Sequence, residues 1–151
     1  MKIVIKKSFL LLAVGCLGLA GCVVLQPESN QTLVHSVACY PETQDARVST
    51  LSQKGIRVDM LGDDVFLTLP LSYAFSNAVA ATVDSGFQST AALIAQFLQC
   101  YNRTTTTVTV YNDVLATRAQ NQVLSAQQAQ AVMDMLWDAG LTDNVMVASG
   151  A

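Results

Sequence analysis

The chain has 151 residues, of which 52% are hydrophobic and 13% are charged, and its eight basic and eleven acidic residues give a net charge of −3. This length suits a single domain with a tail. The basic residues form no continuous stripe, which argues against nucleic acid as a partner and against a charge-held contact with an anionic membrane.

The first residues of the chain have the pattern of a secretory leader. Three lysines make a basic start, residues 8–19 form an apolar run, and small residues follow. The run is too short to cross a bilayer, which takes about 20 apolar residues. The closing motif Leu19-Ala20-Gly21-Cys22 resembles the lipobox of bacterial lipoproteins. The resemblance implies that residues 1–21 are a signal peptide and that the Cys22 sulfur receives a diacylglycerol.

This leader has two alternative interpretations, an ordinary secreted protein cut near Gly21 or an uncleaved anchor. Under the lipoprotein resemblance, Val23 stands where an aspartate commonly retains lipoproteins at the inner membrane. We therefore expect an outer-membrane lipid anchor that faces the periplasm. Residues 22–53 are mostly polar and hold two of the three prolines, so they are predicted to form a tether, with a short strand at residues 34–37.

Two cysteines, Cys39 and Cys100, are left once the leader and the acylated position are set aside. Because compartments outside the cytoplasm permit disulfides, a bridge between them would pin the N-terminal arm to the domain. Two buried thiols are the alternative, and the sequence leaves both open.

The ordered domain is expected to begin with a β-hairpin. Apolar and polar residues alternate over residues 56–60, which is typical of a half-buried strand. Gly62-Asp63-Asp64 is turn chemistry, and residues 65–69 resume as a strand. Residues 71–84 are ambiguous, and we expect a loop with a short helix over residues 77–83.

Two amphipathic helices and two strands follow. Residues 86–99 are predicted to be a helix capped by Asp84 or Ser85, residues 104–111 a strand, residues 125–139 a second helix, and residues 145–147 a final strand. Apolar residues at helical spacing make the buried face of each helix: Phe87, Ala91, Ile94, Phe97, Leu98 and Tyr101 in the first, and Ala129, Val132, Met133, Leu136 and Trp137 in the second.

The predicted element order is ββαβαβ over residues 54–151. Such an order folds as an α+β domain with a mixed three- to four-stranded sheet and helices packed on one face.

The last part of the chain resembles the OmpA-like, peptidoglycan-associated domain. Residues 108–113 match a family strand that ends in Asp113, and Asn121, Leu124-Ser125 and Ala129 follow at the family's spacing without a gap. The resemblance covers the whole predicted domain and implies the fold named above. We expect no cofactor and no metal.

In that family an aspartate and an arginine hold the diaminopimelate of the peptidoglycan stem. The aspartate binds the ammonium group of the diaminopimelate, and the arginine binds its carboxylate. Asp113 matches the aspartate, but Gln128 stands where the arginine should be. A neutral amide loses the charge and the two-pronged grip of a guanidinium. Asn121 and Arg118 are further candidate contacts. Arg118 lies where it could supply the missing cation, and a solvated loop arginine is the alternative; Asn121 also suits a helix cap or a turn.

Other departures also point to a degenerate site, because Val110 replaces a family glycine and Asn112 a threonine. The helix motif with Gln127 and Gln128, and Leu136-Trp137 at its end, resembles lipoproteins of type IVB secretion systems. The resemblance therefore implies a structural subunit of a secretion or envelope complex, with other subunits as partners. A peptidoglycan-binding lipoprotein that makes the wall contact itself is the alternative.

An enzyme is disfavoured by the residues present. His35 is the only histidine and falls in the predicted tether, so no nucleophile–histidine set can be assembled around it. No cluster of His and Cys has metal-ligand spacing. Asp63 and Asp64 are a possible carboxylate pair, but their place in a hairpin turn favours plain turn chemistry.

Overall fold

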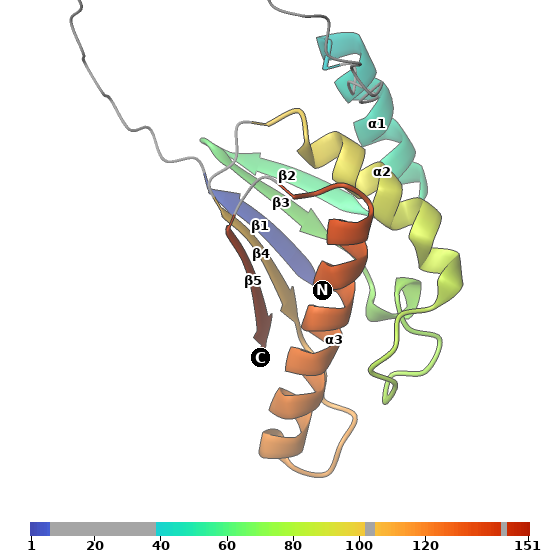
Figure 1. Ribbon diagram of the computed structural model, residues 1–151, viewed down its shortest axis with the longest axis vertical. Coiled ribbons are helices and arrows are strands. Elements are labelled where there is room, and N and C mark those ends of the chain that lie inside the picture. Colours follow the sequence, from blue (N-terminus) through green and yellow to red (C-terminus); the bar gives the residue numbers. More distant parts are fainter. Residues whose placement is uncertain (7–38, 102–104, 143–144) are drawn as a thin grey trace, which may run out of the picture.

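The structure is a computed structural model that describes residues 1–6, 39–101, 105–142 and 145–151. It has two layers, a five-stranded mixed sheet and a layer of helices on one face (Figure 1). The strands are β1 (Lys2–Lys6), β2 (Arg57–Leu61), β3 (Asp64–Thr68), β4 (Thr105–Val110) and β5 (Val145–Gly150), in the spatial order β2-β3-β1-β4-β5. The helices are α1 (Pro41–Gln53), α2 (Gln88–Leu98) and α3 (Arg118–Asp138).

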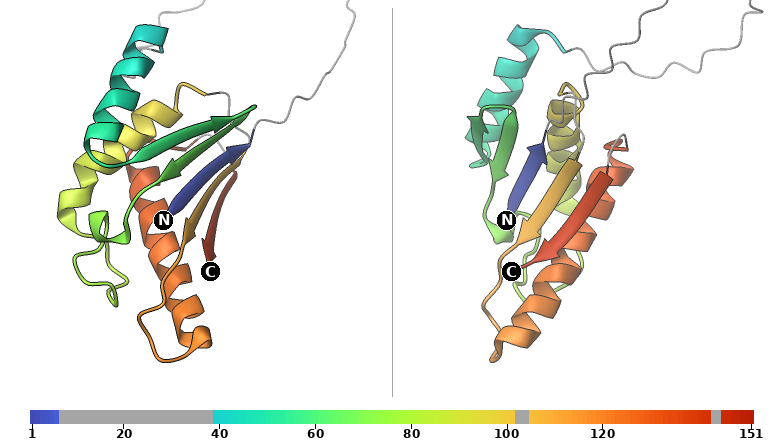
Figure 2. Two further views of the ribbon diagram at one scale, coloured as in Figure 1. Left: turned by 180° about the vertical axis from the view of Figure 1, so that it is seen from behind. Right: turned by 90° about the vertical axis from the view of Figure 1, so that its left-hand side faces the viewer.

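The predicted α+β class, with helices on one face of a mixed sheet, is confirmed. Only β4 and β5 pair in parallel, and the other neighbours are antiparallel. The predicted number of three to four strands is wrong, because β1 is a fifth strand of the sheet. Figure 2 shows α2 and α3 behind the sheet and α1 beside α2.

The predicted hairpin is confirmed as β2 and β3, which pair from Arg57 opposite Thr68 to Leu61 opposite Asp64. Gly62 makes the turn with a φ of 60°, in the left-handed region that glycine adopts without strain. Val65 and Leu67 face the helices and are buried. The alternation read from the sequence therefore sets the register.

Strand β1 occupies the centre of the sheet. It pairs antiparallel with β3 on one side and with β4 on the other, and Ile3 is fully buried opposite Leu67 and Val108. The Met1 amine donates a hydrogen bond of 2.9 Å to the Leu69 carbonyl oxygen, and burial lowers the pKa of this amine. The residues of β1 are also the basic start of the predicted leader, and cleavage of that leader stays a prediction.

Helix α1 corrects the expectations that the tether extends to residue 53 and that the ordered domain begins with the hairpin. It begins with Pro41 in its first turn, where proline is well tolerated, and it packs against α2. The sequence did not predict α1 because Leu51 is the only fully buried residue of this helix, so no apolar stripe marks it.

A disulfide joins Cys39, just before α1, to Cys100, just after α2, with 5.3 Å between the two Cα atoms. Of the two alternatives for these cysteines, the bridge is therefore the one observed. The Gln44 side-chain amide also donates to the Phe97 carbonyl oxygen at 3.4 Å. The N-terminal arm is thus fastened to the end of α2.

The two predicted amphipathic helices are present with altered bounds. Helix α3 starts at Arg118, well before the predicted residue 125, because Thr117 caps it by accepting a hydrogen bond from the Gln120 amide. The predicted buried face is correct except for Trp137, which is 49% exposed. Successive helical residues lie about 100° apart, so Trp137 turns away from the core that Leu136 enters.

The segment between β3 and α2 is a loop with two 3-10 turns, at Leu71–Tyr73 and Ser85–Phe87, and the predicted helix over residues 77–83 is absent. Asp84 does not cap α2 with its side chain. Its carboxylate instead accepts hydrogen bonds from the Ser76 amide and hydroxyl, which closes the loop on itself.

The end of β5 packs closely on α3. A Cβ added to Gly150 would collide with the Ala126 nitrogen and the Gln122 carbonyl oxygen, so only glycine fits. Gly140, with a φ of 97°, ends α3 and turns the chain toward β5. These two glycines fix α3 against the parallel pair β4 and β5.

We predict that Leu136→Ala lowers the free energy of unfolding by about 2–5 kcal/mol, because it leaves a cavity in the core. The neighbouring Trp137→Ala is the matched control and should cost less than about 1 kcal/mol. Urea denaturation of the two variants measures both values. Equal losses would contradict the orientation of α3.

A second prediction concerns the disulfide, which spans a sequence separation of 61 residues. Replacing Cys39 and Cys100 together by serine should lower the free energy of unfolding by ~3–4 kcal/mol, because the unfolded chain regains the entropy of an open loop. A thiol count on unreduced protein checks the bridge itself. In the unprocessed wild-type chain the bridge leaves only the thiols of Cys16 and Cys22, so a count of four free thiols in the folded chain would refute it.

Candidate functional site

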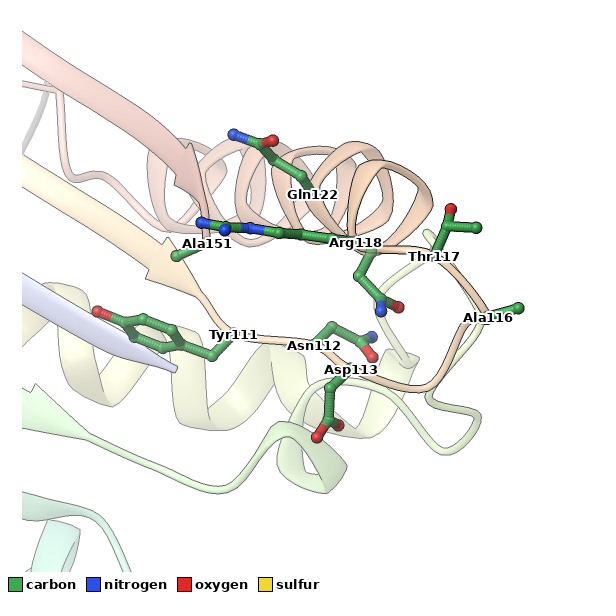
Figure 3. A pocket seen from close by; sticks show the side chains of 9 residues that line it. Tyr111, Asn112, Asp113, Ala116, Thr117, Arg118, Gln122 and Ala151 are labelled. Atoms are coloured by element: carbon green, nitrogen blue, oxygen red, sulfur yellow. The ribbon is translucent and has the colours of Figure 1, made fainter.

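A cavity of about 650 Å³ lies beyond the carboxyl end of β4. Its lining comes from the loop after β4, the first turns of α3 and the residue after β5 (Figure 3). The lining residues are Tyr111, Asn112, Asp113, Ala116, Thr117, Arg118, Asn121, Gln122 and Ala151.

The cavity carries one acidic and one basic side chain. Asp113 projects from the loop after β4, and Arg118 extends from the start of α3 toward Ala151 (Figure 3). Both side chains are exposed, and no salt bridge joins them within the part of the chain that the structure describes. Both charges are therefore exposed at the lining of this cavity, and the Asp113 carboxylate points away from Arg118 (Figure 3).

Two polar side chains hold the loop that carries these charges. The Asn121 amide donates to the Leu115 carbonyl oxygen at 3.0 Å and accepts from the Leu115 nitrogen at 2.7 Å. The Thr117 hydroxyl oxygen accepts a hydrogen bond from the Gln120 backbone nitrogen at 3.3 Å. Asn121 thus uses both ends of its amide to shape the cavity wall.

Gln128, the residue at the position of the family arginine, lies behind the cavity and does not line it. Its side chain is fully buried and donates to the carbonyl oxygens of Ala78 and Ala80 at 2.9 and 2.8 Å. Its oxygen accepts from the Asn112 amide at 2.9 Å. Gln128 therefore ties α3 to the loop before α2 and to the end of β4.

Of the four candidate binding residues, the structure brings Asp113, Asn121 and Arg118 together and leaves Gln128 apart. Sequence reasoning did not single out Tyr111, which is 58% exposed and lines the cavity. A threonine followed three residues later by glutamine marks a helix start, so Thr117 and Gln120 could have revealed that Arg118 opens α3.

The remaining sequence candidates lie elsewhere. Cys22 and His35 are outside the described residues, and Asp63 and Asp64 sit at the hairpin turn. Over the described ranges, no group of three His, Cys, Asp or Glu residues is placed to hold a metal ion. Over the same ranges, no helix has the length and apolar character needed to cross a membrane.

No protein-family model and no curated protein sequence matches the chain. Among solved structures, a MotB-like protein from Desulfovibrio vulgaris is similar, with a TM-score of 0.59 and 16% identity over 72% of this chain and 70% of that one. The OmpA-like domain of FopA1 from Francisella tularensis also matches, with 25% identity over 63% of this chain and 64% of that one. Its TM-score of 0.45 is too low to add to the comparison.

The first match and the order of elements establish the fold as the OmpA-like α+β fold. At 16% identity the likeness extends to the fold alone.

We predict that Gln128→Ala destabilises the protein by about 1–3 kcal/mol, because the carbonyl oxygens of Ala78 and Ala80 and the Asn112 amide each lose a hydrogen bond. Gln127→Ala is the matched control, since Gln127 is exposed on the same helix, and it should cost less than about 0.5 kcal/mol. Urea denaturation compares them. A neutral Gln128→Ala would show that this network contributes nothing to stability.

Proposed function

We propose that the chain is a non-catalytic envelope protein whose cavity binds a zwitterionic group of the peptidoglycan stem. Asp113 would hold the ammonium and Arg118 the carboxylate. The observation that carries this proposal is the presence of exposed, oppositely charged side chains in one cavity, without a salt bridge between them in the described part of the chain.

The chemistry of a zwitterion supports this pairing. A group with one positive and one negative end is held best by one side chain of each sign, and a guanidinium can grip a carboxylate with two hydrogen bonds. The OmpA-like resemblance assigns the cationic role to the position of Gln128. Gln128 is buried here, so Arg118, which lines the cavity, would take this role instead.

We further propose that the protein is anchored in the outer membrane by lipid on Cys22 and faces the periplasm. The lipobox-like motif supports the anchor, and Val23 supports the choice of membrane. Because α1 begins at Pro41, a tether from Cys22 to Cys39 reaches at most about 60 Å. The domain would still stand clear of the lipid surface.

A structural subunit of an envelope assembly is the second candidate. The full use of the Gln128 amide within the fold favours it, because the position that binds ligand in the family has become part of the scaffold. The helix motif and Leu136-Trp137 also resemble IcmN (DotK), a lipoprotein of type IVB secretion systems. Under this candidate, other secretion subunits are the partners and wall contact is weak.

Binding to isolated sacculi tests the first proposal. Asp113→Ala and Arg118→Ala should each weaken binding by about ten-fold or more, because a hydrogen bond to a charged group contributes ~1.5–3 kcal/mol. Asp138→Ala is the control, since Asp138 is exposed at the far end of α3. A pull-down titration with the full chain measures the affinities.

Failure of the wild-type chain to bind sacculi would overturn the wall-binding proposal and leave the subunit role. In that case, purification from native membranes should recover the chain in a stable complex with other envelope proteins. Equal binding by all three variants would show that the contact lies outside this cavity.

A further inference from the structure

Residues 2–6 form the central strand of the sheet, but they also belong to the leader that the proposed lipid anchor would remove. Strand β1 supplies hydrogen-bonding partners to β3 and to β4 (Figure 1). If residues 1–21 are removed, as the proposed lipidation of Cys22 requires, the sheet loses its central strand. A gap one strand wide would then open between β3 and β4, and this inference rests on that step of the proposed function.

The gap, which we call the β1 slot, has a defined chemistry. Position 3 is fully buried opposite Leu67 and Val108, so it requires an apolar side chain. Position 4 lies on the outer face, where Phe66 and Thr107 are half-buried. Unpaired edges on both β3 and β4 would be costly, since buried backbone groups need hydrogen-bond partners.

Position 5 of the slot lies opposite Thr106, whose side chain is fully buried. The Thr106 hydroxyl oxygen makes no hydrogen bond with any residue that the structure describes. Residues paired across strands project their side chains to the same face. A polar side chain at position 5 would therefore meet this unsatisfied hydroxyl.

We propose that residues 32–36 of the same chain fill the β1 slot in the lipidated protein, in the register of residues 2–6. Leu33 then takes the position of Ile3, and Val34 takes that of Val4. His35 takes position 5, where its imidazole can hydrogen-bond the Thr106 hydroxyl. Polar residues flank both segments at the same two positions, Lys2 and Lys6 in one and Thr32 and Ser36 in the other.

The disulfide gives this segment the correct direction and reach. In the proposed register Ser36 lies opposite Thr105, and three residues further on the chain reaches Cys39. Cys39 is bonded to Cys100, which precedes Thr105 by five residues, and each residue of extended chain spans ~3.3–3.6 Å. A segment that runs toward Cys39 enters the slot in the same direction as β1. The bridge also keeps its local concentration high.

This exchange shortens the free tether. With residues 32–36 in the sheet, only the chain from Cys22 to Gln31 links the lipid to the domain, which is about 30 Å when extended. The sheet would then sit about half as far from the membrane as the full tether allows.

Cysteine pairs in the full chain, expressed with its leader, test the proposal. Val34→Cys with Thr107→Cys places the two thiols across the slot from β4, and Val34→Cys with Phe66→Cys places them across from β3. Both cysteine pairs should form a disulfide within one chain in most mature molecules. Mass spectrometry of an unreduced digest identifies these disulfides. Val34→Cys with Val147→Cys is the control, because Val147 pairs with Thr107 from one strand further out and should not react.

The same digest reports the mature N-terminus and the native bond between Cys39 and Cys100, which shows that each variant folds. A retained leader would overturn both this proposal and the lipid anchor, because β1 would keep the slot. A removed leader without the bonds at position 34, or with those bonds only between two chains, would overturn the strand exchange and leave the proposed function standing.

Discussion

The continuity of the sheet depends on one strand. The hairpin of β2 and β3 and the parallel pair of β4 and β5 touch only through β1 within the sheet. One hydrophobic core runs under all five strands and includes Ile3, Leu67 and Val108. Whatever occupies this central position fixes the hairpin relative to α3 and thereby places the loop before α2 behind the cavity. The sheet has no other element that could make this connection, within the described residues.

The site is organised by a division between buried and exposed polar groups. Gln128 and Asn112 are buried and form hydrogen bonds within the fold, whereas Asp113 and Arg118 are exposed and line the cavity. A buried amide is tolerated only when its donors and acceptors are paired, which the backbone of the neighbouring loop provides. Gln128, which the OmpA-like resemblance aligns with a charged residue, is therefore structural in this chain, whereas Arg118 lines the cavity.

Patterns along the sequence predicted much of this fold because they record burial directly. Alternation of apolar and polar residues predicted β2 and β3, and helical spacing predicted α2 and most of α3. Prediction from the sequence failed where the buried residues form no regular pattern. Helix α1 buries only Leu51 completely. It is held by the disulfide between Cys39 and Cys100, and which cysteines pair depends on the tertiary structure. The strand β1 was hidden for another reason, since its residues also fit the basic start of a leader.

The sequence alone determined the fold class, the hairpin register and the place of Asp113 after a strand, because each follows from local spacing. Only the tertiary structure decided that Gln128 faces the scaffold and that Arg118 shares a cavity with Asp113. Both outcomes depend on how α3 is rotated against the sheet and on where its capped first turn lies. Those are consequences of long-range packing, which a linear pattern of side chains does not encode.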